Sequence, residues 1–335
     1  MRRLTFLYHS GFLLESDSAY VVCDFFLDGW QQGQASSRSS DGQGIVPLIG
    51  TEREVFNPAI HQDMQVSSPD EQAVGVLAQL FTHLDKPCFF LASHFHRDHF
   101  NPFILRIYDY VQAQRAQGKD IPAVHLVLSS DIRRTRKKMC LPYMEQGAIS
   151  FLAKGESVSF PEANLQVEAF GSTDVGGSFL FTLDGAQYFH AGDLNEWHWQ
   201  EESTASEIKA ARSLYARELD FIAEKASSNA PLTAVMFPCD PRMKVSYFTG
   251  ATKFLRRLPA SLLVPMHMWE EPQTVVAALK EEPWLSKWQL FTGVQEQPLP
   301  LAMQPCAALE GKEGSGTKYT GLVWIAEHAG DYCVL

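Results

Sequence analysis

The stretch that most constrains this chain is LASHFHRDHFNP, residues 91–102. An apolar run at 88–92, CFFLA, leads into it and has the length and composition of a buried strand. Asn101 and Pro102 close it as a helix N-cap and a first-turn proline. Between them lie four side chains that can bind a metal ion: His94, His96, Asp98 and His99. We therefore expect a ligand cluster on a loop between a strand and a helix, where rigid elements hold functional residues.

The spacing within this cluster suggests two metal ions. Imidazoles two residues apart on an extended segment point to the same side, so His94 and His96 can bind one cation. Asp98 and His99 lie at the turn into the helix and project to a second point. Two cations about 3.5–4 Å apart are what a two-metal hydrolytic site requires. An exposed polar loop without ligands is the alternative, but it explains a single histidine better than this pattern.

The H-x-H-x-D-H pattern resembles the signature of the metallo-β-lactamase superfamily. The resemblance implies an α/β fold, a four-layer αββα sandwich with a dinuclear metal site at one edge. The opening HSGF at 9–12 looks most like the branch that includes L-ascorbate-6-phosphate lactonase and many uncharacterised hydrolases. The expected organisation is one domain over 1–300 with an insertion at about 29–82, which could cover the site or be a surface excursion. Residues 301–335 form a C-terminal extension, for which an edge strand and an oligomer contact both remain open.

The segment GSTDVGG at 171–177 departs from the superfamily pattern. Relatives normally place a histidine here as the third ligand of the first metal, and this chain has none. Asp174 is the strongest ligand in the segment, so either it replaces the histidine or the first site is depleted. A carboxylate makes the site harder and favours manganese or iron over zinc; otherwise Asp174 is a turn residue. We expect two divalent metal ions, zinc or manganese, with iron as a further candidate.

Two later motifs complete the ligand set that the resemblance implies. HAGD at 190–193 follows an apolar strand and resembles the motif whose aspartate bridges both metals, a role that suits a carboxylate because it can bind two cations. His267 follows the last strong strand, at the place of the final ligand of the second metal. The predicted set is His94, His96 and Asp174 for the first metal, Asp98, His99 and His267 for the second, and Asp193 as the bridge, with Asp98 and Asp193 as the catalytic carboxylates.

Seven further residues are candidates for positioning ligands or lining a substrate pocket. For Asp24 we favour a role in orienting a metal-bound histidine. His9 is equally consistent with a structural histidine beside the metals, and His190 fits a place behind the ligands. The remaining four follow the strands that end at this edge, and each also fits ordinary packing or, for the last two, an Asp–Arg turn pair: Trp197, His198, Asp240 and Arg242.

Composition narrows the function classes. The formal net charge of −11 argues against non-specific binding to nucleic acid, which needs a basic face. The basic run at 133–138 is more typical of a solvated helix face than of a phosphate groove. Six cysteines without a C-x-x-C pair indicate a reducing compartment. Because no signal peptide is evident and no apolar run reaches the roughly 18 residues that span a bilayer, a cytoplasmic protein without a membrane partner is expected.

These features favour a metal-dependent hydrolase, in which a hydroxide bridging two metals attacks a small anionic ester, lactone or phosphoester. The expected partner is that small-molecule substrate rather than nucleic acid, and a homo-oligomer remains open. Two alternatives also remain open. One is a non-catalytic or redox single-metal protein that retains the fold, and the other is a phosphodiesterase or nuclease of the same superfamily. The number of metal ions bound per chain separates the two-metal hydrolase from the single-metal protein.

Overall fold

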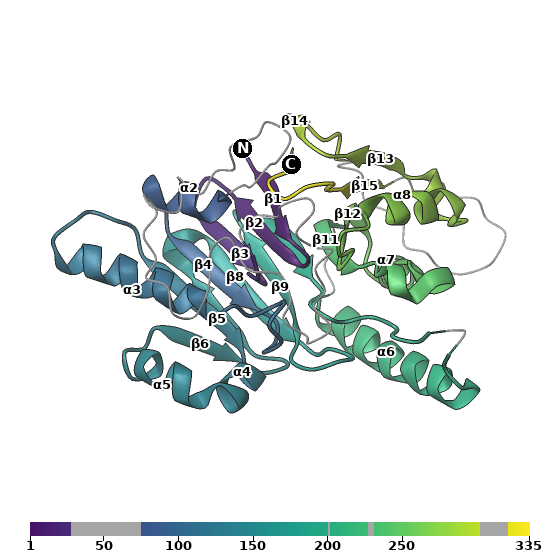
Figure 1. Cartoon of the computed structure of the whole chain (residues 1–335), viewed down its shortest axis with the longest axis horizontal. Coiled ribbons are helices and arrows are strands. Elements are labelled where there is room, and N and C mark those ends of the chain that lie inside the picture. The colour runs from purple at the N-terminus through teal and green to yellow at the C-terminus, as the bar shows by residue number, and fades with distance from the viewer. Residues whose placement is uncertain (28–74, 200–201, 227–230, 302–320) are drawn as a thin grey trace, which may run out of the picture.

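The computed structural model describes residues 1–27, 75–199, 202–226, 231–301 and 321–335. Within these ranges two eight-stranded sheets pack face to face, and helices cover the outer face of each (Figure 1). The expected α/β fold, a four-layer αββα sandwich, is confirmed. None of the helices in these ranges is long and apolar enough to cross a membrane.

The first sheet begins with the hairpins of the N-terminus. β1, β2 and β3 pair antiparallel in turn, and β3, β4, β5 and β6 then run parallel. β1, β3 and β4 consequently end at the same edge. In spatial order the strands are β14 (Gln295–Pro298), β16 (Tyr332–Val334), β1 (Arg3–Tyr8), β2 (Gly11–Glu15), β3 (Tyr20–Cys23), β4 (Cys88–Ala92), β5 (Val124–Ser129) and β6 (Ile149–Leu152).

The second sheet is built around the parallel strands β10, β11 and β12. Their carboxyl ends also share one edge, and β15 continues the parallel run on the far side of β12. In spatial order the strands are β13 (Gln289–Thr292), β15 (Leu322–Ile325), β12 (Ala260–Met266), β11 (Leu232–Pro238), β10 (Ala186–His190), β9 (Ser178–Leu183), β8 (Leu165–Phe170) and β7 (Ser157–Phe160).

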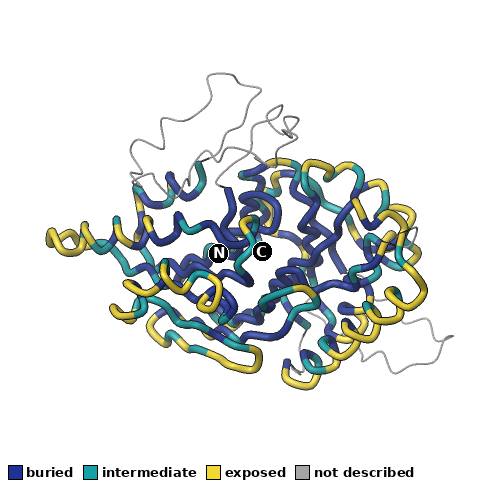
Figure 2. Tube along the Cα trace, turned by 60° about the horizontal axis from the view of Figure 1, so that its bottom comes forward, coloured by how far each residue is buried: buried dark blue, intermediate teal, exposed yellow. Residues whose placement is uncertain are grey.

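The helices divide between the two outer faces. Their buried residues cluster with one sheet or the other, while their outward faces are exposed, as Figure 2 shows along the periphery. The helices on the first sheet are α2 (Val76–Thr82), α3 (Phe103–Ala116), α4 (Ser130–Thr135) and α5 (Lys137–Glu145), and those on the second are α6 (Ala205–Lys225), α7 (Thr249–Arg257) and α8 (Pro272–Glu281). Short 3₁₀ turns cover η1 (Pro161–Ala163), η2 (Pro241–Ser246) and η3 (Leu285–Lys287).

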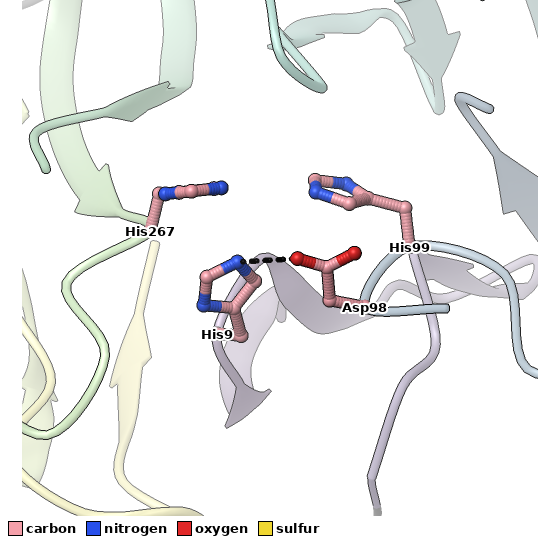
Figure 3. A group of neighbouring side chains, drawn as sticks. All are labelled: His9, Asp98, His99 and His267. Carbon is pink, nitrogen blue, oxygen red and sulfur yellow. Dashed lines mark ion pairs between the residues drawn. The ribbon is translucent and has the colours of Figure 1, made fainter. Parts of the chain in front are cut away.

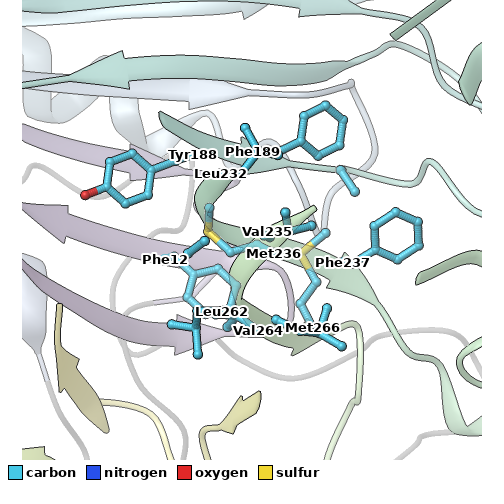
Figure 4. Packing of buried hydrophobic residues seen from close by; sticks show 14 of the residues in the cluster. Phe12, Tyr188, Phe189, Leu232, Val235, Met236, Phe237, Leu262, Val264 and Met266 are labelled. Atoms are coloured by element: carbon cyan, nitrogen blue, oxygen red, sulfur yellow. The ribbon is translucent and has the colours of Figure 1, made fainter. Parts of the chain in front are cut away.

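Aromatic side chains join the two sheets in the central core. The rings of Phe89 on β4 and Phe160 on β7 lie 4.7 Å apart between centroids, across the interface. Phe12 of the first sheet packs among side chains of β10, β11 and β12 (Figure 4). Each buried side chain of this size stabilises the fold by about 1.5–3 kcal/mol relative to exposure. The core therefore holds the two sheets, and the loops at their shared edge, in a fixed relation.

Two expectations about elements need correction. The basic run at 133–138, interpreted from the sequence as one helix face, spans two helices, because Arg136 leaves the helical region with φ −113°. The C-terminal extension from 301 does not end in an edge strand: β15 lies between β12 and β13, and β16 lies between β1 and β14. Most of the insertion at 29–82 and part of the extension, 302–320, lie outside the described residues.

Candidate metal centre

Loops from both sheets meet at one edge of the sandwich. This convergence follows from the topology, since parallel strands bring their carboxyl ends to a common edge. The first sheet supplies His9 after β1, Asp24 after β3, and His94, His96, Asp98 and His99 after β4. The second sheet supplies Asp174 between β8 and β9, Asp193 after β10, Asp240 after β11 and His267 after β12.

The ligand-type side chains form two adjacent groups, and in each the nearest nitrogen and oxygen atoms lie within 4.8 Å of one another. The inner group is His9, Asp98, His99 and His267 (Figure 3). The outer group is His94, His96, Asp174 and Asp193. The structure thus brings together all seven residues that the sequence analysis assigned to the metals, and it separates them into two groups. His9 is an addition to the inner group, where the sequence left its role open.

Asp193 lies between the two groups. Its Oδ1 is 3.1 Å from Nε2 of His99 and 3.5 Å from Nε2 of His267, both in the inner group. Its Oδ2 is 3.4 Å from Nε2 of His94 in the outer group. The two oxygens of one carboxylate therefore face different groups, which is the placement that a bridging ligand requires.

Two further carboxylates orient histidines of the inner group. Nδ1 of His99 donates to Oδ2 of Asp24 over 2.7 Å, and Nδ1 of His267 donates to Oδ2 of Asp240 over 2.8 Å. Asp24 is itself held by the backbone and hydroxyl of Ser93, at 2.7 and 2.6 Å. With Nδ1 occupied, each ring presents Nε2 toward Asp193. This is how carboxylates behind a metal site set the tautomer and direction of a histidine ligand.

The electrostatics of the site keep the carboxylates ionised. Burial alone would raise the pKa of Asp193, but the nearby rings of His99, His267 and His94 hold it well below its ordinary value. The pKa of Asp24 is lowered in the same way, against the effect of burial, by His190 and His99. Burial would lower the pKa of His99, but Asp193 and Asp24 raise it well above the usual range.

Two other histidines of the site, His9 and His94, have lowered pKa values and are neutral at pH 7. Burial and repulsion from His267 lower the pKa of His9 to about 3, and burial together with His99 lowers that of His94 to about 4. A metal ligand must be deprotonated, so both rings are in the state that binding needs.

Several buried atoms test whether a metal fits. Both ring nitrogens of His9, Nε2 of His99 and Oδ1 of Asp193 have no hydrogen-bond partner among the described residues. A buried polar atom left unpaired costs about 1–3 kcal/mol. Their convergence on one place fits cation binding, which would satisfy them together. Imidazole nitrogens with carboxylate oxygens suit zinc, manganese or iron.

Backbone strain gathers at the same place. His9, Asp24 and His267 have φ values of 57°, 44° and 63°, in the left-handed region that residues other than glycine rarely adopt. Such conformations cost on the order of 1–3 kcal/mol each and persist where the surrounding structure imposes them. Here they turn the chain at strand ends and aim the side chains into the site.

His190 and Trp197 lie directly behind the ligands. Nε2 of His190 is 2.8 Å from the carbonyl oxygen of Ser10, and its Nδ1 is 3.7 Å from Oδ2 of Asp24. The indole Nε1 of Trp197 donates to the backbone oxygen of Asp193 over 2.7 Å, and the Trp197 ring lies 5.6 Å from that of His267. His190 thus stays outside both groups, as expected, and Trp197 borders the inner one.

His198 does not join the site. Its Nε2 lies 3.3 Å from Oε1 of Glu196, a buried carboxylate that also pairs with Arg212 and Lys253. His198 therefore pairs with Glu196 and, among the described residues, forms no ion pair with the ligand-type side chains of the two groups.

Arg242 and Asp240 form the turn pair that the sequence left open, Asp240 also contacts His267, and a substrate contact of Arg242 stays a prediction. The guanidinium forms the turn pair with Asp240, at 2.9 Å from Nε to Oδ1, while Asp240 also accepts from His267. Arg242 lies 5.1 Å over the ring of Trp269, and its side chain is half exposed. Trp269 and Ser93 were missed at the sequence level. The adjacency of Ser93 to His94 was the available signal for the serine, whereas no pattern marked Trp269.

No family model matches the sequence, and neither does any curated protein. Solved structures with a similar chain path include the metallo hydrolase Igni18 from Ignicoccus hospitalis, at 15% identity over 84% of this chain and 91% of that one, with a TM-score of 0.45. YhfI from Bacillus subtilis, a metallo-β-lactamase fold protein, is 11% identical over 99% of both chains, with a TM-score of 0.45. CmlA from Streptomyces venezuelae, a diiron β-hydroxylase, is 11% identical over 84% of this chain and 50% of that one, with a TM-score of 0.44. Likeness at this level leaves the activity to be inferred from the side chains themselves.

Proposed function

We propose that this chain is a metal-dependent hydrolase that acts on a small anionic ester, lactone or phosphoester. The observation that carries the proposal is the position of Asp193, whose two oxygens face two adjacent groups of ligand-type side chains. A single structural metal would need only one such group. Two groups sharing a carboxylate favour a dinuclear centre of the kind used for hydrolysis.

The residues of the chain would divide the work as follows. The inner and outer groups would hold two divalent cations, which when bound supply Lewis acidity and lower the pKa of a water molecule between them. Asp24 and Asp240 would hold the imidazole rings of His99 and His267 in a fixed orientation, so that little reorganisation is needed during the reaction. Asp98, only partly exposed and 3.4 Å from His9, is the ionised carboxylate best placed to orient that water.

Asp98 would act as a carboxylate rather than as an acid. Burial would raise its pKa, but the nearby rings of His9 and His99 hold the pKa below its ordinary range. No proton is therefore stored on Asp98 at neutral pH, and it can accept a hydrogen bond from a bound water.

Arg242 supports an anionic substrate. Its guanidinium is held by Asp240 beneath and lies over Trp269, yet half of the side chain remains exposed. The hydrogen bond to Asp240 raises the pKa of Arg242 above its ordinary value, and the charge of Asp240 adds to this effect. Burial acts in the opposite direction but is outweighed, so the guanidinium stays charged. A fixed, partly exposed guanidinium suits a carboxylate or phosphate.

The test is a hydrolysis assay on metal-loaded protein. The protein is reconstituted with zinc, manganese or iron and offered lactones, carboxylic esters and phosphoesters, each as an anionic compound and a neutral counterpart. We expect turnover of an anionic member that a chelator abolishes and that Asp193→Ala lacks. Arg242→Lys keeps the charge but loses the planar fork, and should raise KM for the anionic compound more than for the neutral one.

The same preparation tests the alternatives. A protein that holds two metals and hydrolyses no member of the panel would contradict the proposal. Redox-active absorption of the iron-loaded form would favour the alternative of a redox metal protein. Asp98, Asp174 and Asp193 make the donor set rich in oxygen, which suits iron. Cleavage of a dinucleotide in preference to small phosphoesters would favour the phosphodiesterase.

A further inference from the structure

The inner and outer groups differ in exposure. In the inner group the side chains of His9 and His99 are fully buried, that of His267 is 5% exposed and that of Asp98 is 28% exposed. In the outer group the side chain of His94 is fully buried, whereas those of His96 and Asp174 are 40% and 44% exposed. A cation held by the inner group would therefore be more enclosed by protein than one held by the outer group.

The two groups also differ in how firmly their ligands are held. Two inner histidines have Nδ1 fixed by buried carboxylates, as described above for Asp24 and Asp240. In the outer group Nδ1 of His94 is 3.0 Å from the neutral hydroxyl of Ser93, and no described carboxylate lies behind His96. Loss of such support typically weakens a metal site about 10–100-fold, so unequal support implies unequal affinity.

His9 adds a donor to the inner group alone. Its ring is fully buried, both nitrogens lack a hydrogen-bond partner among the described residues, and Nε2 points to Oδ2 of Asp98 at 3.4 Å. The ring lies 4.0 Å from that of His267 and 4.3 Å from that of Trp269, which leaves it little freedom. With Oδ1 of Asp193 the inner group offers five donor residues. Sites closed by protein ligands are typical of retained metals, whereas reactive sites keep an open position.

We propose that the two groups are unequal: the inner group, completed by His9, retains its cation, and the outer group, with Asp174, holds an exchangeable cation that faces the substrate. The inference rests on the metal-binding part of the proposed function but not on hydrolysis. It assigns His9 a ligand role, and it makes Asp174 the residue that keeps the second cation replaceable.

Binding of manganese and zinc to the metal-stripped protein, measured by titration calorimetry, tests this inequality. We expect two steps in the wild type, and elemental analysis after graded chelator treatment should show one metal lost well before the other. Asp174→Ala should remove the weak step and leave the tight one unchanged. His9→Asn should weaken the tight step by at least about tenfold. Asparagine tolerates the left-handed backbone that position 9 requires, so this variant is less prone to misfold than alanine.

A matched control is His328→Ala, which removes a histidine that is 47% exposed and distant in sequence from both groups, and should leave both steps intact. Two equal steps in the wild type, or a tight step that survives in folded His9→Asn, would overturn the inference. If His9→Asn fails to fold, the Asp174→Ala result still decides, because loss of the tight step there contradicts the assignment. Binding is measured without substrate, so the two proposals can fail separately. A protein that shows two unequal binding steps but no activity would contradict the proposed hydrolase and leave the inference about the two groups intact.

Discussion

At the scale of single residues, a hydrogen bond from a histidine Nδ1 to a buried aspartate occurs twice in the site. Asp24 and Asp240 come from different sheets, yet each accepts from Nδ1 of an inner histidine at nearly the same distance. Both carboxylates are fully or almost fully buried, and their pKa values lie below the ordinary range despite burial, because the histidines they contact favour the ionised form. We infer that they position the candidate ligands His99 and His267 rather than bind substrate.

Replacing Asp24 by asparagine tests that role. Asn keeps the size of the side chain but removes the charge that polarises His99, so inner-cation affinity should fall about 10–100-fold with the fold retained. Calorimetric titration measures the fall. Asp240→Asn should weaken the same step through His267, although it also releases Arg242. An unchanged tight step in both variants would mean that the two carboxylates serve packing alone.

The carboxylate at position 174 predicts a metal preference. Asp174→His restores the residue type that the superfamily pattern normally places in this segment, and it exchanges a hard oxygen donor for an imidazole. The outer cation should then prefer zinc over manganese by at least about tenfold more than in the wild type, since imidazole suits zinc and carboxylate suits manganese. Competition of the two metals, followed by elemental analysis, measures this ratio. A ratio that stays constant would place Asp174 outside the coordination sphere.

The candidate ligands were predictable from the sequence where several chemical signals coincided. His94, His96, Asp98 and His99 sit in one motif between a strand and a helix, and this local order is visible without a structure. His9 gave no comparable signal, because its place in the inner group depends on a left-handed backbone and on contact with His267, which is 258 positions away. Such a contact is set by the packing of two sheets, not by local pattern.

At the scale of elements, the loop after β8 packs against the loop that carries the first two histidines. Gly176 has φ +71°, and a Cβ there would lie 2.3 Å from both Cβ of His94 and the backbone oxygen of Ser93. The neighbouring Gly177 donates to that same oxygen over 2.9 Å. The close approach of the two loops is therefore part of what places Asp174 beside His94 and His96.

Gly176→Ala should thus lower both the stability of the fold and the affinity of the outer group for its cation. Gly118 offers a matched control, because its φ is +80° but a Cβ there would meet nothing within 4 Å. Gly118→Ala should cost only the left-handed penalty of about 1–2 kcal/mol. Gly176→Ala should cost at least about 1 kcal/mol more, because the close contact adds strain, and should also weaken the outer metal step. Urea unfolding and calorimetry measure both effects. Equal losses in the two variants would contradict the role of the loop contact.

Elements with a clear pattern were predicted within a few residues, and those without one were not. The apolar runs at 88–92 and before HAGD predicted β4 and β10, and the N-cap signal at 101–102 predicted the start of α3. Strand β14, with the sequence QEQP, carries no apolar signal and forms only because β16 offers an unpaired edge. Helix α7 begins TGAT, which is poor in helix formers, and depends on packing over the second sheet. Tertiary contacts decide such segments.

At the scale of the whole molecule, each group of ligand-type side chains contains residues that follow strands of both sheets. His9, Asp98 and His99 follow strands of the first sheet, and His267 follows β12 of the second. The outer group likewise joins His94 and His96 to Asp174 and Asp193. A cation in either group would link the two sheets at the edge where their loops meet, so metal binding should stabilise the sandwich as a whole rather than one loop.

Removal of metal should therefore lower the melting temperature of the entire chain in one transition. A ligand at about 100 times its Kd adds about 2.7 kcal/mol to the native state. For a chain of this size that corresponds to a shift on the order of 5 °C. Differential scanning calorimetry with and without chelator measures the shift. Asp193→Asn weakens the carboxylate shared by both groups, so its melting temperature should depend much less on metal. A shift as large in Asp193→Asn as in the wild type would show that the metal acts elsewhere, and two separate transitions would show that the sheets are not linked through it.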